Sequence, residues 1–226
     1  MDEARRFLRY VLPGYVYFVE TGLFLLIIFP RWTVDLLSKT TDNLGTVLGS
    51  IFVASAFGYI FSTVHHWLYW ILPSDRGVLN HVPLIKRLEH YLSVGSVKER
   101  QEALEISCAY WYQLSANAIS SEGVKKLNSL GDMTHSLGAA RIASVFALAT
   151  TLLVGLKIGE CDLRCEPILR FILMMFLSGI TIYAFHSGYK RVGIIAQNIY
   201  DRLFEDAIRK RGTYKRGPGP KNENNL

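Results

Sequence analysis

Charged residues are absent from long stretches of this 226-residue chain. No Asp, Glu, Lys or Arg occurs in residues 43–74, 142–156 or 171–189, and residues 10–29 contain only one, Glu20. About 20 apolar residues, each rising about 1.5 Å along a helix, cross the hydrocarbon core of a bilayer. The uncharged runs therefore predict an all-α, polytopic membrane protein with four transmembrane helices and the lipid bilayer as its partner.

The chain also lacks the motifs of soluble enzymes. It contains no P-loop, no Rossmann glycine pattern, no nucleophile elbow and no kinase motif. Its histidines form neither an HExxH box nor an HxxxH pair. We therefore expect a protein that is not an enzyme and that uses no cofactor.

Lys and Arg are unevenly distributed, and this predicts the orientation in the membrane. Nineteen of the 25 lie before residue 10, between the second and third predicted spans, or after residue 189. Cytoplasmic loops carry the excess of positive charge in membrane proteins. We expect a multi-pass protein of a cell inner membrane with both termini in the cytoplasm. Topology explains the basic residues, so no nucleic-acid partner is predicted.

The same reasoning divides the chain into five segments. They are a transmembrane hairpin (1–72), a cytoplasmic helical segment (73–135), a second transmembrane hairpin (136–187), an amphipathic helix (188–211) and a disordered tail (212–226). A capping box starting at Ser96 predicts a helix start in the cytoplasmic segment. That segment has too few apolar residues for a large core of its own. We expect it to form a cytoplasmic helical layer together with the amphipathic helix.

Cysteine is scarce, with three in the chain. Cys161 and Cys165 fall in a short outer loop and Cys108 in the cytoplasmic segment. A disulfide between Cys161 and Cys165 would persist in an oxidising compartment. Spacing alone leaves open whether their Cα atoms approach closely enough, so a disulfide and free thiols both remain alternatives.

Glu20 is the most informative single residue. It lies near the middle of the first span, where a charged side chain costs about 3 kcal/mol on insertion scales. The carboxyl must be protonated, face a wet cavity, or have a cation or hydrogen-bond donor beside it. Two interpretations stay open: a proton or ion pathway, and a carboxyl that holds helices together. Arg141 in the third span is a less favoured partner, since its long side chain can also reach the membrane surface.

Four histidines fall at one membrane depth, near the cytoplasmic surface. His65 and His66 lie late in the second span, His135 opens the third span, and His186 closes the fourth. Imidazoles titrate near neutral pH and also bind Zn²⁺, so gating groups and a metal site are both alternatives. The pattern favours histidines that form hydrogen bonds near the lipid headgroups.

Small residues in the second span predict close helix packing. Gly45 and Gly49 form a GxxxG pair, and Gly58 continues the small-residue pattern. Small side chains let helix backbones approach each other in lipid. The partner helix belongs either to the same chain or to another copy, and we expect a homo-oligomer.

The leading hypothesis is a non-enzymatic, homo-oligomeric inner-membrane protein, channel-like or signal-responsive, whose cytoplasmic layer binds a soluble protein partner. A role in stress or antiviral (phage) defence fits that shape by analogy only. Glu20, Arg141 and the four histidines would then control gating or proton coupling. One alternative is an intramembrane metalloenzyme with His65 or His66, His135 and His186 as ligands. Another is a proton-coupled small-molecule exporter that uses Glu20.

Overall fold

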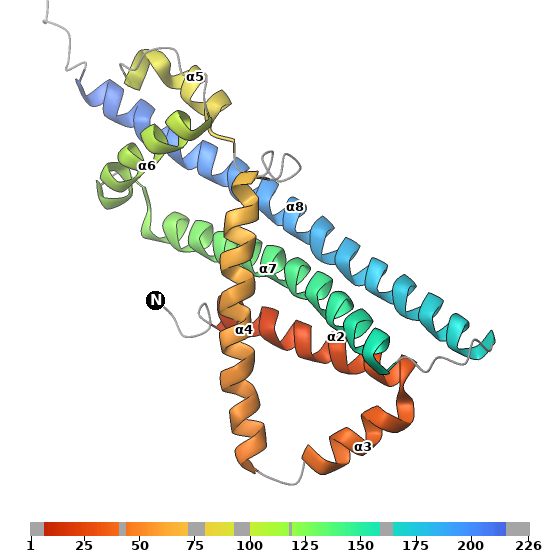
Figure 1. Cartoon of the computed structure of the whole chain (residues 1–226). Helices are drawn as coiled ribbons and strands as arrows, with labels where there is room; N and C mark the ends of the chain where they lie inside the picture. The colour runs from red at the N-terminus through yellow and green to blue at the C-terminus, as the bar shows by residue number, and fades with distance from the viewer. Residues whose placement is uncertain are drawn as a thin grey trace, which may run out of the picture. The chain divides into compact units, whose positions relative to one another are not determined.

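The computed structural model of the chain describes residues 7–40, 44–71, 80–92, 100–117, 119–158 and 165–215. Each element in these ranges is helical, which confirms the predicted all-α class (Figure 1). The elements are η1 (Phe7–Val11), α2 (Leu12–Ile28), α3 (Pro30–Thr40), α4 (Leu44–Ile71), α5 (Val82–Leu92), α6 (Arg100–Asn117), α7 (Ser121–Ile158) and α8 (Cys165–Lys215).

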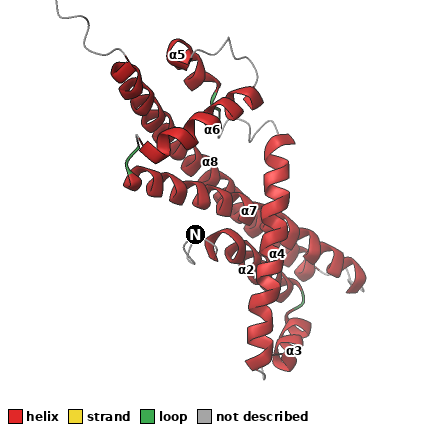
Figure 2. Ribbon diagram, turned by 90° about the vertical axis from the view of Figure 1, so that its left-hand side faces the viewer, coloured by secondary structure: helices red, strands yellow, loops and turns green. Residues whose placement is uncertain are grey.

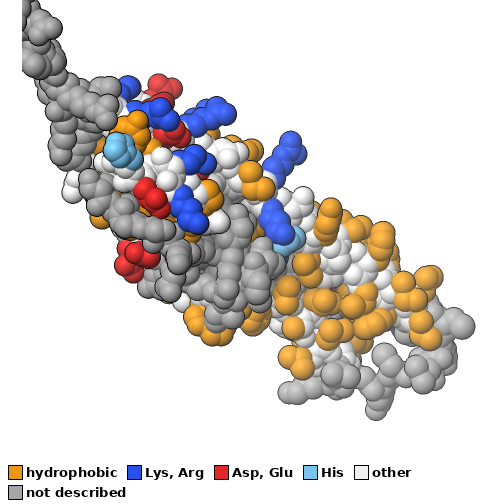
Figure 3. All heavy atoms as spheres, turned by 90° about the horizontal axis from the view of Figure 1, so that it is seen from above, with side chains coloured by type: hydrophobic (Ala, Val, Ile, Leu, Met, Phe, Trp, Pro, Cys, Tyr) orange, Lys and Arg blue, Asp and Glu red, His pale blue; other side chains and the backbone are white. Residues whose placement is uncertain are grey.

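Four of these helices are long and apolar enough to cross a membrane. The qualifying stretches lie in Arg9–Ile28, Gly49–Leu68, Ser121–Gly155 and Ile168–Lys210. Large apolar side chains are exposed on them, among them Phe52 (77%), Leu153 (65%) and Leu169 (68%). Along α8, Figure 3 shows apolar side chains gathered over the beginning of the helix and Lys and Arg over its later part. Lipid is the solvent that suits such a surface, and the prediction of four transmembrane helices is confirmed.

The chain forms two compact units. The first contains residues 1–75 and 131–192, and we call it the membrane unit. The second contains residues 76–130 and 193–226, and we call it the second unit. Helices α7 and α8 each contribute residues to both units.

Small residues on α7 bring the helices of the membrane unit together. Ala139, Ala140, Ala143, Ser144 and Ala147 are all fully buried. Phe61 of α4 packs on Ala139 and Ala143, and Phe24 of α2 packs with Met174 of α8 on Ala147. The buried face of α7 thus serves as the common contact surface for the other three membrane helices.

Helices α2 and α4 cross at two glycines (Figures 1 and 2). A Cβ atom at Gly14 would overlap the backbone of Ala54, and one at Gly58 would overlap the backbone of Tyr10. Gly49, by contrast, has nothing within 4 Å of such an atom. Gly58 therefore packs within the chain, whereas the surface at Gly49 is open. The surroundings of Gly45 lie outside the described residues.

The second unit has a core made by three helices. Its buried residues are Leu84, Ile85, Leu88 and Leu92 of α5, Ala103 and Leu114 of α6, and Phe204, Ala207 and Ile208 of α8. The apolar face of α8 therefore supplies the surface that residues 73–135 lack by themselves. The sequence analysis predicted that residues 73–135 associate with the amphipathic helix, and described residues of both segments contribute to this core.

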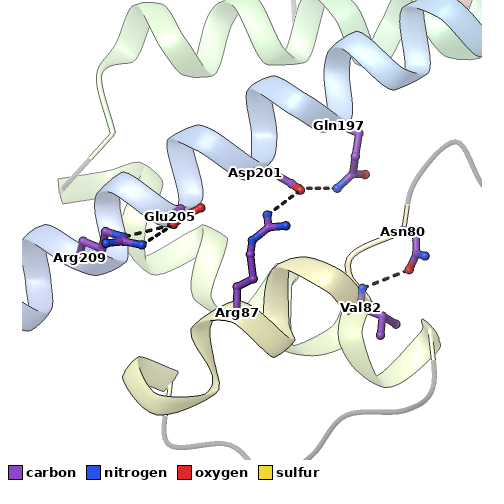
Figure 4. A network of polar contacts seen from close by, with 7 residues as sticks. All are labelled: Asn80, Val82, Arg87, Gln197, Asp201, Glu205 and Arg209. Atoms are coloured by element: carbon purple, nitrogen blue, oxygen red, sulfur yellow. Dashed lines mark hydrogen bonds and ion pairs between the residues drawn. The ribbon is translucent and has the colours of Figure 1, made fainter.

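An ion pair joins α5 to α8 at the edge of this core, and further polar contacts lie within α8 and at the start of α5 (Figure 4). Arg87 of α5 donates to the Asp201 carboxylate at 3.4 Å, and Gln197 donates to the same carboxylate. The Asn80 side chain accepts a bond from the Val82 amide at 3.1 Å and so caps the start of α5.

Several predicted features lie outside the described residues. They are the capping box at Ser96, the tail after residue 215, Cys161 and the side chain of Cys165. Cys108 is a free, exposed thiol on α6. The loop after the first span contains α3, a helix that hydrogen-bonds back to Phe29 through the Thr33 hydroxyl.

We expect Gly58→Leu to destabilise the membrane unit by about 3 kcal/mol, because the added side chain meets backbone rather than a movable side chain. Gly49→Leu is the matched control on the same helix and should change the free energy of unfolding by less than about 0.5 kcal/mol. Denaturant unfolding of the purified protein in detergent measures both. Equal effects for the two substitutions would show that α2 and α4 do not cross here.

We expect Phe204→Ala to destabilise the second unit by about 4 kcal/mol, because it removes a fully buried ring from the core. Tyr112→Ala removes a ring that is 78% exposed and should cost less than about 0.5 kcal/mol. Hydrogen exchange of α5 and α6 reports the difference. Unchanged protection in Phe204→Ala would contradict the core assignment.

Candidate functional site

Glu20 is buried in the membrane unit with a hydrogen-bond donor beside it. The Ser144 hydroxyl of α7 donates to Glu20 Oε1 at 2.9 Å. The Thr181 side chain of α8 interacts with the same carboxyl. The second oxygen, Oε2, is buried and has no hydrogen-bond partner among the described residues. The carboxyl therefore joins three helices, and one of its oxygens is unsatisfied.

Arg141 lies one helical turn before Ser144 on α7. Its guanidinium donates to Nδ1 of His186 on α8 at 2.9 Å and lies 5.2 Å from the centre of the Tyr189 ring. A guanidinium can only donate, so Nδ1 of His186 must be the acceptor. An imidazole protonated on both nitrogens cannot accept this bond. The contact therefore requires a neutral His186 with its proton on Nε2.

The other three histidines lie in a series of ring contacts that begins at Tyr189. The His65 ring lies 5.2 Å from the Tyr189 ring and 5.9 Å from the His135 ring. The His66 ring lies 6.2 Å from the His135 ring. Gly138 of α7 makes this arrangement possible, because a Cβ atom there would overlap the His65 ring.

Charged groups from η1 and α7 lie at the histidine end. Arg9 of η1 interacts electrostatically with His135, as does His66. Arg9 also forms an ion pair with Asp132 of α7 at 3.9 Å. A change in the protonation of His135 would therefore alter its interactions with neighbours on η1 and α4.

These groups form two contact clusters, one around Glu20 and one from Arg141 to His66, which adjacent turns of α7 connect. We call the two clusters together the polar seam. Its members are Glu20, His65, His66, His135, Arg141, Ser144, Thr181, His186 and Tyr189, from α2, α4, α7 and α8. All six residues predicted to act in gating or proton coupling belong to it. The contacts of Glu20 and Arg141 run through Ser144 and His186 rather than through a bond between the two.

Sequence reasoning missed Ser144, Tyr189 and Gly138. Ser144 lies three residues after Arg141, and this helical spacing puts both on one face of α7. That spacing was a signal that could have connected Glu20 with the histidines. Tyr189 and Gly138 carry no such signal, because their roles depend on how α4 and α8 approach α7.

The histidines do not form a metal cage in the described part of the chain. There, no group of three or more His, Cys, Asp or Glu side chains is placed to hold a metal ion. The rings instead contact one another and Tyr189 through edges and faces.

Comparisons with known proteins identify no relative of this chain. No protein-family model matches the chain, and no curated protein or solved structure is significantly similar to it.

We expect Arg141 and His186 to be coupled energetically. In a double-mutant cycle of Arg141→Met and His186→Phe, the interaction energy should be about 2 kcal/mol, the typical net value of a hydrogen bond made by a charged group. Ser55 provides the control cycle with Arg141, because its hydroxyl donates to Ile51 on its own helix. Additive effects for Arg141 and His186 would show that the bond is not formed.

Proposed function

We propose that this protein is a non-enzymatic membrane protein, channel-like or signal-responsive, that responds to protonation of the polar seam. The observation that carries the proposal is the pair of contacts made by adjacent turns of α7. Ser144 binds the Glu20 carboxyl, and Arg141 binds His186. Intramembrane ionisable groups that pair with one another mark proton and ion pathways.

The chemistry of the seam supports a response to pH. Its six ionisable members are Glu20, Arg141 and four histidines, and histidine is the side chain that ordinarily changes charge near neutral pH. Protonation of His186 removes the acceptor for Arg141 and places two cations side by side. The packing of α7 against α8 then changes, because that bond joins the two helices.

In our proposal, helices α7 and α8 transmit this change in packing to the second unit. Both helices contribute residues to the second unit as well as to the membrane unit. The second unit would then bind a soluble partner in one protonation state of the seam. Tyr112 and Cys108, both exposed on α6, are candidates for that contact.

Homo-oligomerisation belongs to the same proposal. Gly22, Gly49 and Gly179 each have open space beside them, on α2, α4 and α8. Small residues on exposed transmembrane faces are typical sites of helix association. Four helices enclose little interior, so a pore would be made between copies.

Reconstituted protein tests the proposal. In liposomes containing a pH-sensitive dye, the ion flux of the wild type should change at least about fivefold between pH 8 and pH 5.5. Glu20→Gln and His186→Phe should each remove most of this dependence, because each deletes a titrating group of the seam. His90→Ala is the control, since His90 is exposed on α5 in the second unit.

A flux that responds to pH equally in all four proteins would rule out the seam as the sensor. Flux absent at every pH would rule out the channel-like form. A flux that requires one small-molecule substrate would instead favour the exporter.

A further inference from the structure

We propose that the Glu20 end of the polar seam is a binding site for a monovalent metal cation of the sodium class. The site consists of Glu20 on α2, Ser144 on α7, and Ser178 and Thr181 on α8. The inference rests on the proposed function, since it names a ligand for one part of the same seam. It also makes a claim of its own, because a proton-responsive protein need not bind any metal ion.

The groups at this site are all oxygen donors. Glu20 supplies a carboxyl, and Ser144, Ser178 and Thr181 supply hydroxyls. Hard cations prefer carboxylate, hydroxyl and carbonyl oxygens to nitrogen or sulfur. The Ser144 hydroxyl donates toward Glu20 Oε1 at 2.9 Å and toward the Ala140 carbonyl at 3.2 Å. The Thr181 hydroxyl donates to the Ser178 carbonyl at 3.0 Å and also interacts with the Glu20 carboxyl. The lone pairs of both hydroxyl oxygens therefore remain available to a cation.

Glu20 Oε2 and Ser178 Oγ are buried and have no hydrogen-bond partner among the described residues, and the same is true of Thr21 Oγ1 beside Glu20 on α2. Glu20 is 7% exposed and Ser178 is fully buried. A serine inside a helix can donate to the carbonyl of the preceding turn, but Ser178 does not. Buried polar atoms without partners are energetically costly, and water molecules or ions commonly satisfy such atoms in proteins. A cation would satisfy Glu20 Oε2 and Ser178 Oγ.

The packing places Ser178 at the depth of Glu20. Phe24, Ala147 and Met174 form one contact layer of the membrane unit. Glu20 lies one helical turn from Phe24, Ser144 lies one turn from Ala147, and Ser178 lies one turn from Met174. In each case the step is toward the histidines, since α8 runs opposite to α2 and α7. The three oxygen-bearing residues therefore form the next layer.

The single negative charge that Glu20 can carry favours a monovalent cation over a divalent one. Glu20 is the only acidic group of the site, and the three hydroxyls are neutral. A monovalent cation gives a neutral site beside the apolar layer of Phe24, Ala147 and Met174. A divalent cation would leave one uncompensated charge there, which is strongly unfavourable in a medium of low dielectric constant. A proton on Glu20 is the competing occupant, because it also neutralises the carboxylate.

Direct binding of radioactive ²²Na⁺ to the full-length protein in nanodiscs tests the site. At pH 8 and constant ionic strength, set with choline chloride, the wild type should bind ²²Na⁺ saturably. Lowering the pH to 5.5 should weaken the binding about tenfold or more, since protons compete for Glu20. Unlabelled NaCl should displace the label, whereas choline chloride should not.

Variants assign the binding to these residues. Glu20→Gln should abolish it, and Ser178→Ala should weaken it about tenfold through loss of one ligand. Ser55→Ala is the matched control, a serine on α4 that donates within its own helix, and it should bind as the wild type does. Should Glu20→Gln fail to fold, Glu20→Asp serves in its place and should weaken binding by shortening the carboxylate arm.

The outcomes separate this inference from the proposed function. No saturable ²²Na⁺ binding by the wild type overturns the cation site, as does binding that survives in Glu20→Gln. In either case, a flux that still depends on pH and on His186 would leave the proton-responsive function standing. Binding with a flux indifferent to pH would support the cation site and overturn the proposed function.

Discussion

The structure depends on one constraint: an ionisable side chain inside a transmembrane helix needs partners on other helices, because lipid offers none. Glu20 meets this constraint through Ser144, and Arg141 meets it through His186. Both partners are available because alanines and glycines let α7 lie close to its neighbours. The small residues let the helix backbones approach each other. The buried ionisable side chains need this close approach in order to reach their partners.

The sequence was sufficient for the fold class and for the number of transmembrane helices. Both follow from hydrophobic length, which is a local property of the chain. The grouping of His65, His66 and His135 was also readable, since position along each span indicates which residues of neighbouring helices lie at the same level. The partners of Glu20 and Arg141 were not readable, because they depend on the rotation of each helix about its axis. That rotation is set by packing, through contacts such as Gly14 on Ala54 and Phe24 on Met174.

The second unit follows a different rule from the membrane unit. Its buried residues include several leucines, and Lys, Arg and Glu residues are exposed on its surface. Residues 73–135 supply two of its helices, and the third comes from α8, far along the chain. An amphipathic stretch indicates that a helix has one apolar face but does not say what covers that face. The sequence therefore predicted that the two segments associate, but not which of their residues pack together.

Gly138 shows how little freedom such an arrangement leaves. The imidazole of His65 rests against the α7 backbone at a point where even a methyl group has no room. Gly131, two turns earlier on the same helix, has open space beside it. Substitution by a larger residue should accordingly be tolerated at position 131 but not at position 138. The hydrogen atom that glycine carries in place of a side chain thereby determines where the His65 ring can lie within the membrane unit.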